Sequence, residues 1–117
     1  MSPHRTIDLN ADVGEATDAA GIEMERALLG VVTTAHIACG GHAGDEETMT
    51  DTVAAALARS VRIGAHPSYP DRDGFGREPM AIDRGALREA LSSQLRDLER
   101  ISRDAGTSVE SVKPHGA

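Results

Sequence analysis

The sequence predicts an α/β fold in which parallel strands alternate with helices. Short β-branched segments alternate with helix-length segments along the 117 residues, in the order β-α-β-α-β-α-β. Strands joined through helices run parallel, with right-handed crossovers. Each strand segment also leads into a polar or glycine-rich cluster, as expected where active-site loops follow parallel strands. The last strand is followed only by residues 114–117, so we expect residues 1–117 to form a single partial domain that stops after its fourth strand, the first half of a larger α/β barrel or open sheet.

The first half of the chain contains two predicted strands and two predicted helices. Residues 6–10 (TIDLN) form the first strand segment, residues 20–32 a short helix, and residues 33–39 (TTAHIAC) the second strand. Apolar residues recur at helical spacing after Asp45. Asp45 is a good N-cap, and the two glutamates after it place negative charge where the helix dipole favours it. A second helix is therefore predicted to begin there.

The second half repeats this alternation with a longer loop. Residues 61–65 (VRIGA) form the third predicted strand, and a loop rich in proline and glycine spans residues 66–80. Asp83 caps the longest predicted helix, which carries a stripe of leucines and closes at Gly106. The fourth strand is predicted at residues 108–113 (SVESVK).

Composition excludes several classes of function. The net charge of −7 argues against nucleic-acid binding, which needs clustered lysine and arginine. No apolar run approaches the ~20 residues of a membrane span, and the N-terminal residues lack the apolar stretch of a signal peptide. The single cysteine, Cys39, rules out an internal disulfide and fits a reducing compartment. We therefore expect an acidic, cytoplasmic domain.

Polar residues on the first and last strands are predicted to share faces. Asp8, Asn10 and Asp12 alternate along the first strand, and Lys113 and His115 alternate at the end of the last, so each set lies on one face. A carboxylate on the face of a covered strand needs a polar cavity. We expect these residues to line one, although carboxylates at strand ends also serve as helix caps or loop acceptors.

The turn after the second strand is dense in glycine. Gly40, Gly41 and Gly44 surround His42 just before the helix cap at Asp45. Free amide groups at a helix N-terminus bind anions, so this turn is a candidate anion site. The glycine spacing is not that of a P-loop, and no lysine follows. His42 has a structural alternative, as a histidine that merely packs in the turn.

The loop at residues 66–80 carries further candidates. Pro67 pushes the backbone of His66 into an extended conformation, and Arg72 and Arg77 are the best-placed cations for a phosphate or a carboxylate. Both aromatic residues of the chain lie in this loop, which suggests that they fold over a pocket or line its rim. The alternative is an ordinary charged surface loop.

Four motifs, in the same order along nearly the whole chain, resemble the LamB/YcsF family: IDLNADVGE, IACGGHAGD, IGAHPSYPDRDGFGR and VKPHGA. The resemblance implies a distorted seven-stranded (β/α) barrel of the glycoside hydrolase/deacetylase type, of which this chain forms the first half. It also implies a role as the A subunit of an ATP-dependent 5-oxoprolinase. That enzyme cleaves 5-oxo-L-proline to L-glutamate, with ATP becoming ADP and phosphate, in a complex with subunits B and C.

The resemblance also implies the site residues. The catalytic candidates are Asp8, Asn10, Asp12, Glu15, His42, His66, Lys113 and His115. The candidates for binding ATP or a phosphorylated lactam are Gly40, Gly41, Gly44, Asp45, Arg72 and Arg77. A water would attack the activated lactam, with Asp12 or a histidine as general base. Asp12, His42 and His66 are candidates for a divalent metal site, as in related deacetylases.

The sequence departs from the family's usual pattern. His36 and Gly41 stand where the second motif usually has Asn and Phe, so we expect substrate fit to differ; the stretch after Glu15 also diverges, and family members are much longer. Two other functions remain open. One is a small-molecule or partner-binding module without turnover, and the other is a metal-dependent deacetylase or lactam hydrolase that needs no ATP. The unpaired edge after the fourth strand predicts self-association.

Overall fold

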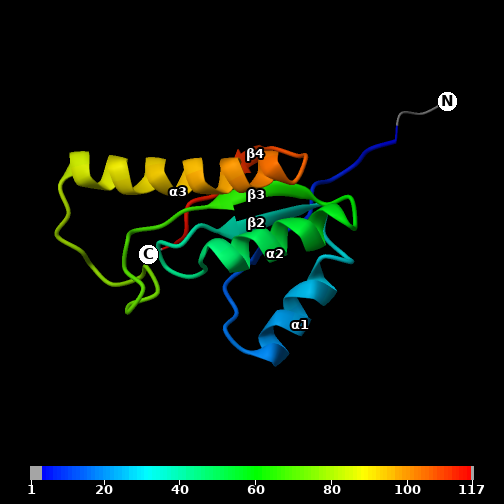
Figure 1. Ribbon diagram of the computed structural model, residues 1–117, viewed down its shortest axis with the longest axis horizontal. Helices are drawn as coiled ribbons and strands as arrows, with labels where there is room; N and C mark the ends of the chain where they lie inside the picture. The colour runs from blue at the N-terminus through cyan, green and yellow to red at the C-terminus, as the bar shows by residue number, and fades with distance from the viewer. Residues whose placement is uncertain (1–3, 117) are drawn as a thin grey trace.

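Four parallel strands alternate with three helices in the computed structural model, which describes residues 4–116 (Figure 1). The strands pair in chain order, β1-β2-β3-β4, and every pair is parallel. They are β1 (Asn10–Val13), β2 (Thr34–Ala38), β3 (Arg62–His66) and β4 (Val109–Val112). The predicted parallel α/β architecture is confirmed. Within residues 4–116 the sheet is open, because β1 pairs only with β2 and β4 pairs only with β3.

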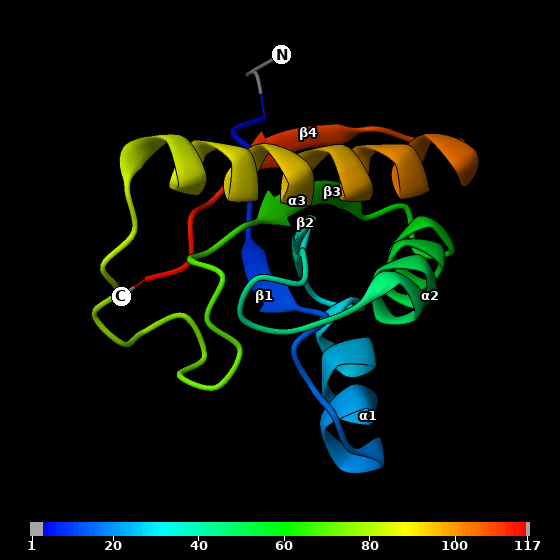
Figure 2. The same ribbon diagram turned by 60° about the vertical axis from the view of Figure 1, so that its left-hand side comes forward.

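Each helix begins at an aspartate whose side chain accepts a hydrogen bond from the first turn. The helices are α1 (Ala19–Leu28), α2 (Glu46–Leu57) and α3 (Arg84–Asp104), and their N-caps are Asp18, Asp45 and Asp83. The caps predicted at Asp45 and Asp83 are confirmed. Helices α2 and α3 pack together beside the sheet, whereas α1 stands apart from them (Figures 1 and 2). Helix α1 ends at Leu28, earlier than predicted, because the chain turns at Leu29–Val31.

The core lies between the sheet and the helices α2 and α3, and it is aliphatic, as the scarcity of aromatic residues predicts. Ile37 and Ile63 from the strands are fully buried against Val53 of α2 and Leu98 of α3. Only the C-terminal part of the leucine stripe on α3 is buried in this core. The N-terminal leucines stay partly exposed, because that end of α3 projects beyond the sheet (Figure 2).

The first strand begins later than predicted. Residues 6–8 are not in β1, and the carbonyl of Leu9 accepts hydrogen bonds from the amides of Thr33 and Thr34 just before the strand starts. Ile7 and Leu9 are exposed, because nothing within residues 4–116 packs on that side of the strand. Gly106 has a φ of +94° and closes α3 as predicted. No helix in the described part of the chain has both the length and the apolar character that crossing a membrane requires.

Candidate active site

An ammonium group and a carboxylate meet above the sheet, although they come from its two edge strands. Nζ of Lys113, just after β4, lies 2.5 Å from Oδ1 of Asp12 and donates a hydrogen bond of 2.7 Å to Oδ1 of Asn10 on β1. His66, the last residue of β3, places Nε2 3.4 Å from the second carboxylate oxygen of Asp12. The structure therefore brings these four predicted residues together above the sheet. His66 and Lys113 lie at the C-terminal ends of β3 and β4, whereas Asn10 is the first residue of β1.

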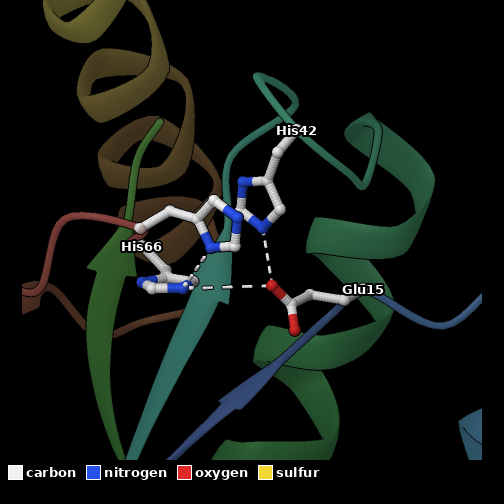
Figure 3. Close-up of side chains that lie close together, drawn as sticks. Glu15, His42 and His66 are labelled. Atoms are coloured by element: carbon white, nitrogen blue, oxygen red, sulfur yellow. Dashed lines mark hydrogen bonds and ion pairs between the residues drawn. The ribbon is translucent and has the colours of Figure 1, made fainter. Parts of the chain in front are cut away.

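A second group of side chains lies next to this ion pair. Ligand atoms of Glu15, His42, His66 and His115 all lie within 4.8 Å of one another, and we call these four residues the histidine–glutamate cluster. Nε2 of His42 lies 2.6 Å from Oε2 of Glu15, and the Glu15 carboxylate points up toward both labelled imidazoles in Figure 3. The rings of His42 and His115 stack with centroids 3.9 Å apart. His42 and His66 are buried.

Backbone carbonyl groups fix which nitrogen of two imidazoles faces the cluster. Nδ1 of His66 donates to the carbonyl oxygen of Lys113 at 2.5 Å, and Nε2 of His115 donates to that of Phe75 at 2.7 Å. A carbonyl only accepts, so the proton of each neutral ring sits on this outer nitrogen. The lone pairs of His66 Nε2 and His115 Nδ1 then face each other across 3.3 Å. Two lone pairs so close repel each other unless a proton or a metal cation lies between them.

The loop after β3 covers the cluster. Phe75 packs edge-on against His42 and His115, with ring centroids 4.9 and 5.2 Å away. Gly76 has a φ of +70°, and a Cβ atom there would lie 3.0 Å from the His42 Cβ and from the His115 ring. Only a glycine lets the backbone approach both imidazoles this closely. The guanidinium of Arg77 lies 5.3 Å from the Phe75 ring centroid, so it flanks the cover and not the cluster.

Two protonation states follow from these contacts. Burial alone raises the pKa of Asp12, but the hydrogen bond from Lys113 and the charges of His66 and Lys113 outweigh it, so the pKa lies below its usual value. Burial lowers the pKa of His115, and the hydrogen bond to the Phe75 carbonyl offsets this only in part. At neutral pH Asp12 is therefore an anion, and His115 is a neutral ring with a free lone pair.

Asp8 lies away from this site, although it shares a face with Asn10 and Asp12. Its carboxylate accepts hydrogen bonds from the hydroxyls of Thr33 and Thr34, at the beginning of β2. A strand rises about 3.3 Å per residue, so four positions place Asp8 roughly 13 Å from Asp12. It lines a separate 390 Å³ pocket at the opposite end of the strands.

The residues predicted to bind a phosphate separate from the cluster as well. Five of them, Gly40, Gly41, Gly44, Asp45 and Arg72, line one 480 Å³ pocket that also touches α2 and α3. Within it, Nη1 of Arg72 donates to the carbonyl oxygens of Gly40 and Gly44 at 3.1 and 2.5 Å. Asp45 accepts from the amide of Thr48. The turn thus presents carbonyls to Arg72, and a carboxylate already fills the first turn of α2.

Sequence reasoning grouped the metal ligands differently. It joined Asp12 with His42 and His66, whereas the structure groups those two histidines with Glu15 and His115 and pairs Asp12 with Lys113.

Cys39, interpreted as a buried residue, is indeed buried, and burial raises the pKa of its thiol to about 11.

Sequence reasoning also missed one residue that holds the covering loop. The buried Gln94 of α3 accepts from the amide of Ser68 at 3.0 Å and donates to its carbonyl at 2.9 Å. A glutamine inside the predicted leucine stripe was the only signal for it.

The chain is similar to proteins with assigned names. A sequence model of the LamB/YcsF family matches residues 7–117. A protein from Methylococcus capsulatus (strain Bath), named as the A subunit of 5-oxoprolinase, is 50% identical over 113 residues, which cover 97% of this chain and 44% of the relative. A protein of the same name from Corynebacterium efficiens is 44% identical over 117 residues, covering 100% of this chain and 46% of the relative.

A solved structure agrees with these relatives. The crystal structure of a lactam utilization protein from Thermus thermophilus superposes with a TM-score of 0.89 and 36% sequence identity, over 97% of this chain and 46% of that one. This chain thus spans less than half the length of the relatives it matches. Because the family model covers nearly all of its residues and relatives share up to half of them, the chain belongs to the LamB/YcsF family.

Proposed function

We propose that this chain acts as part of the A subunit of an ATP-dependent 5-oxoprolinase, which converts 5-oxo-L-proline and water to L-glutamate while ATP becomes ADP and phosphate. The names of the relatives from Methylococcus capsulatus and Corynebacterium efficiens support this reaction. The likeness to a lactam utilization protein from Thermus thermophilus supports a lactam as the substrate class. The observation that carries the proposal is the meeting of Asp12, Lys113 and the histidine–glutamate cluster at one end of the strands.

The chemistry of the substrate explains why such a site is needed. A five-membered lactam is a stable amide, so its carbonyl group must be activated before water attacks. In the proposed reaction the terminal phosphoryl group of ATP passes to the lactam carbonyl oxygen, and ADP leaves. Water then adds to the carbonyl carbon and the ring C–N bond breaks, with a proton going to the freed amine, which leaves an acyl phosphate. A second water hydrolyses the acyl phosphate to glutamate and phosphate. Asp12 is a weak base because its pKa is held low. The facing nitrogens of His66 and His115 are therefore the better acceptors for the water proton.

The cluster also fits a divalent metal ion. One carboxylate oxygen and three imidazole nitrogens within 4.8 Å of one another are a typical donor set for zinc or a similar ion. The carbonyls of Lys113 and Phe75 orient His66 and His115 as ligands, in the manner of outer-shell partners at metal sites. A bound ion would polarise a carbonyl group and make its bound water acidic. Glu15, His42, His66 and His115 would hold it.

This donor set favours a second candidate function, a metal-dependent lactam hydrolase or deacetylase that uses no ATP. With the three imidazoles engaged as ligands, Asp12 is the nearby carboxylate left to receive a proton, and Lys113 is placed to stabilise a developing negative charge. The two candidates therefore assign the general base differently. Asp12→Asn should abolish the metal-dependent hydrolysis, because it removes the general base. In the ATP-dependent reaction the same change should mainly remove the ion-pair partner of Lys113.

The proposed reaction also needs a site for ATP and two partner subunits. We assign ATP binding to the assembled complex with subunits B and C, in the reducing environment of the cytoplasm. From this chain, Arg72 and the turn Gly40–Gly44 line one pocket and would contribute to the phosphate site, whereas Arg77 lies beside Phe75. Because Arg72 binds the turn carbonyls, its guanidinium must leave them to reach a phosphate.

The test is a reconstitution. The chain is mixed with subunits B and C and with the remaining C-terminal part of the Methylococcus capsulatus relative, and glutamate and phosphate are measured with 5-oxo-L-proline and ATP. We expect equal amounts of both products, and their loss in Glu15→Gln and His42→Ala but not in Glu23→Gln. Activity that EDTA abolishes and nucleotide leaves unchanged would favour the second candidate. Binding of 5-oxoproline without either product would indicate a binding module.

A further inference from the structure

A carboxylate from α1 binds three consecutive backbone amides in the turn that carries Glu15. Oε1 of Glu25 accepts from the amide of Gly14 at 3.1 Å, and Oε2 accepts from those of Glu15 and Ala16 at 3.0 and 3.1 Å. Successive N–H groups that converge on one point form an anion-binding concavity, or nest. Here the anion comes from the chain itself.

The conformation of Gly14 creates this nest. Its φ of +76° turns the chain directly after β1, and a Cβ atom at this position would lie 3.2 Å from the side chain of Ile37. The turn therefore depends on a glycine. The turn points the amides of Glu15 and Ala16 at the carboxylate of Glu25. At the same time, Oε2 of Glu15 lies 2.6 Å from Nε2 of His42.

Apolar packing does little to hold this arrangement. Helix α1 buries none of its residues and stands apart from α2 and α3 (Figure 2), with Met24 and Ile22 exposed. The three hydrogen bonds of Glu25 are therefore the main polar link between α1 and the Glu15 turn. Glu15 is the only member of the cluster on that turn (Figure 3).

We propose that Glu25 is a positioning residue, which fixes the Glu15 backbone so that its carboxylate meets His42 and His66. The proposal rests on the proposed function of the cluster as a divalent metal site. Glu25 touches neither substrate nor ion; it acts through the amide of Glu15. Residues that orient a ligand in this way typically change metal affinity by about 10- to 100-fold when they are replaced.

The substitution Glu25→Gln tests this assignment. The amide keeps the size of the side chain, but its NH₂ group replaces one of the two acceptors and so faces a backbone donor. We expect the affinity for Zn²⁺, measured by competition with a chromophoric chelator, to fall about 10- to 100-fold. The matched control Glu23→Gln removes the same charge from an exposed position on the same helix, and it should leave the affinity within about twofold of the unmodified chain, because it breaks no contact to the Glu15 turn.

A second readout needs no metal. In the metal-free chain, ¹⁵N shifts of the Gly14, Glu15 and Ala16 amides and of His42 Nε2 report the turn and its contact. Glu25→Gln should move all four signals, and Glu23→Gln should not. If the unmodified chain binds no Zn²⁺, the metal proposal fails and these shifts alone decide the role of Glu25. Unchanged ¹⁵N shifts in Glu25→Gln would overturn the positioning role of Glu25. The role would also be overturned if Glu25→Gln kept its Zn²⁺ affinity while Glu15→Gln lost Zn²⁺ binding. A lower melting temperature with unaltered affinity would assign Glu25 a merely structural role and overturn it as well.

Discussion

Lys113 and Asp12 form an ion pair across the full width of the sheet, with Nζ and Oδ1 2.5 Å apart, although β4 and β1 are its two edge strands. The same ammonium group binds Asn10. Side chains from opposite edges can meet only if the strands curve around their inner face. The pair thus shows that the four-stranded sheet is curved around a polar face, and the attraction between the two charges helps to hold that curvature.

We predict that Lys113→Met raises the pKa of Asp12. Burial already favours the neutral acid, and the variant removes the hydrogen bond and the charge that outweigh it. A group whose pKa is lower in the folded state stabilises the fold above its unfolded pKa, and that contribution is lost as pH falls through the folded pKa. The unmodified chain should therefore lose more unfolding free energy than the variant between about pH 5 and pH 2. Carboxyl ¹³C titration gives the pKa directly, and an unchanged Asp12 pKa would contradict the prediction.

The contact between His36 and Gly64 predicts a second effect. His36 of β2 packs against Gly64 of β3, where a Cβ atom would come within 2.7 Å of both His36 Nε2 and the Ser111 hydroxyl. Gly64→Ala should therefore destabilise the fold by about 1–3 kcal/mol through overpacking. The double variant His36→Ala/Gly64→Ala should recover part of this loss, as measured by urea unfolding. The control Gly85→Ala, in the exposed first turn of α3, should be neutral or slightly stabilising.

His36 also predicts a pH dependence of stability. Burial, followed by the charge of Lys113, lowers its pKa, and Asp12 and Asp8 oppose this only in part. The unfolded chain therefore binds more protons than the folded chain in the pH range between the lowered pKa and the unfolded pKa of about 6.5. Unfolding free energy should rise with pH through that range, by at most about 1.4 kcal/mol per pH unit for this group. His36→Gln should flatten the slope and the exposed His4→Gln should not. Equal slopes in the two variants would refute this role of burial.

The parts of the fold and site that the sequence predicts are those set by chain topology. Parallel strands in chain order place the residues at the end of each strand at one edge of the sheet. The approach of Asp12, His66, Lys113 and His115 to one another can therefore be predicted without knowing their rotamers. The caps at Asp45 and Asp83 were equally predictable, because a short acceptor before a helical pattern satisfies local amides wherever the helix lies.

The parts that were not predictable depend on distances and on loops. Alternation places Asp8 on the same face as Asp12 but does not give its position along the strand axis, so the two were grouped together. The approach of Phe75 and Gly76 to the histidines depends on a loop conformation with two successive positive φ values. The link from Glu25 to the Glu15 turn joins a helix to a turn about ten residues earlier and leaves no periodic signal in the sequence. For these reasons only the three-dimensional structure shows that Glu15 lies with the three histidines and that Asp12 pairs with Lys113.

The open edges of the sheet predict that the chain self-associates. Within the described residues β1 and β4 each pair with a single neighbour, and Val112 on β4 is half exposed. Unpaired strand edges with apolar side chains pair readily with other strands. Sedimentation velocity between about 10 and 200 µM should show a concentration-dependent increase in mass. Val112→Lys should reduce it, because a lysine on an edge strand opposes strand pairing. The control Met24→Lys places the same charge on the exposed face of α1. If Met24→Lys abolishes association and Val112→Lys does not, α1 and not the strand edge is the contact surface, and a monomer at every concentration contradicts both.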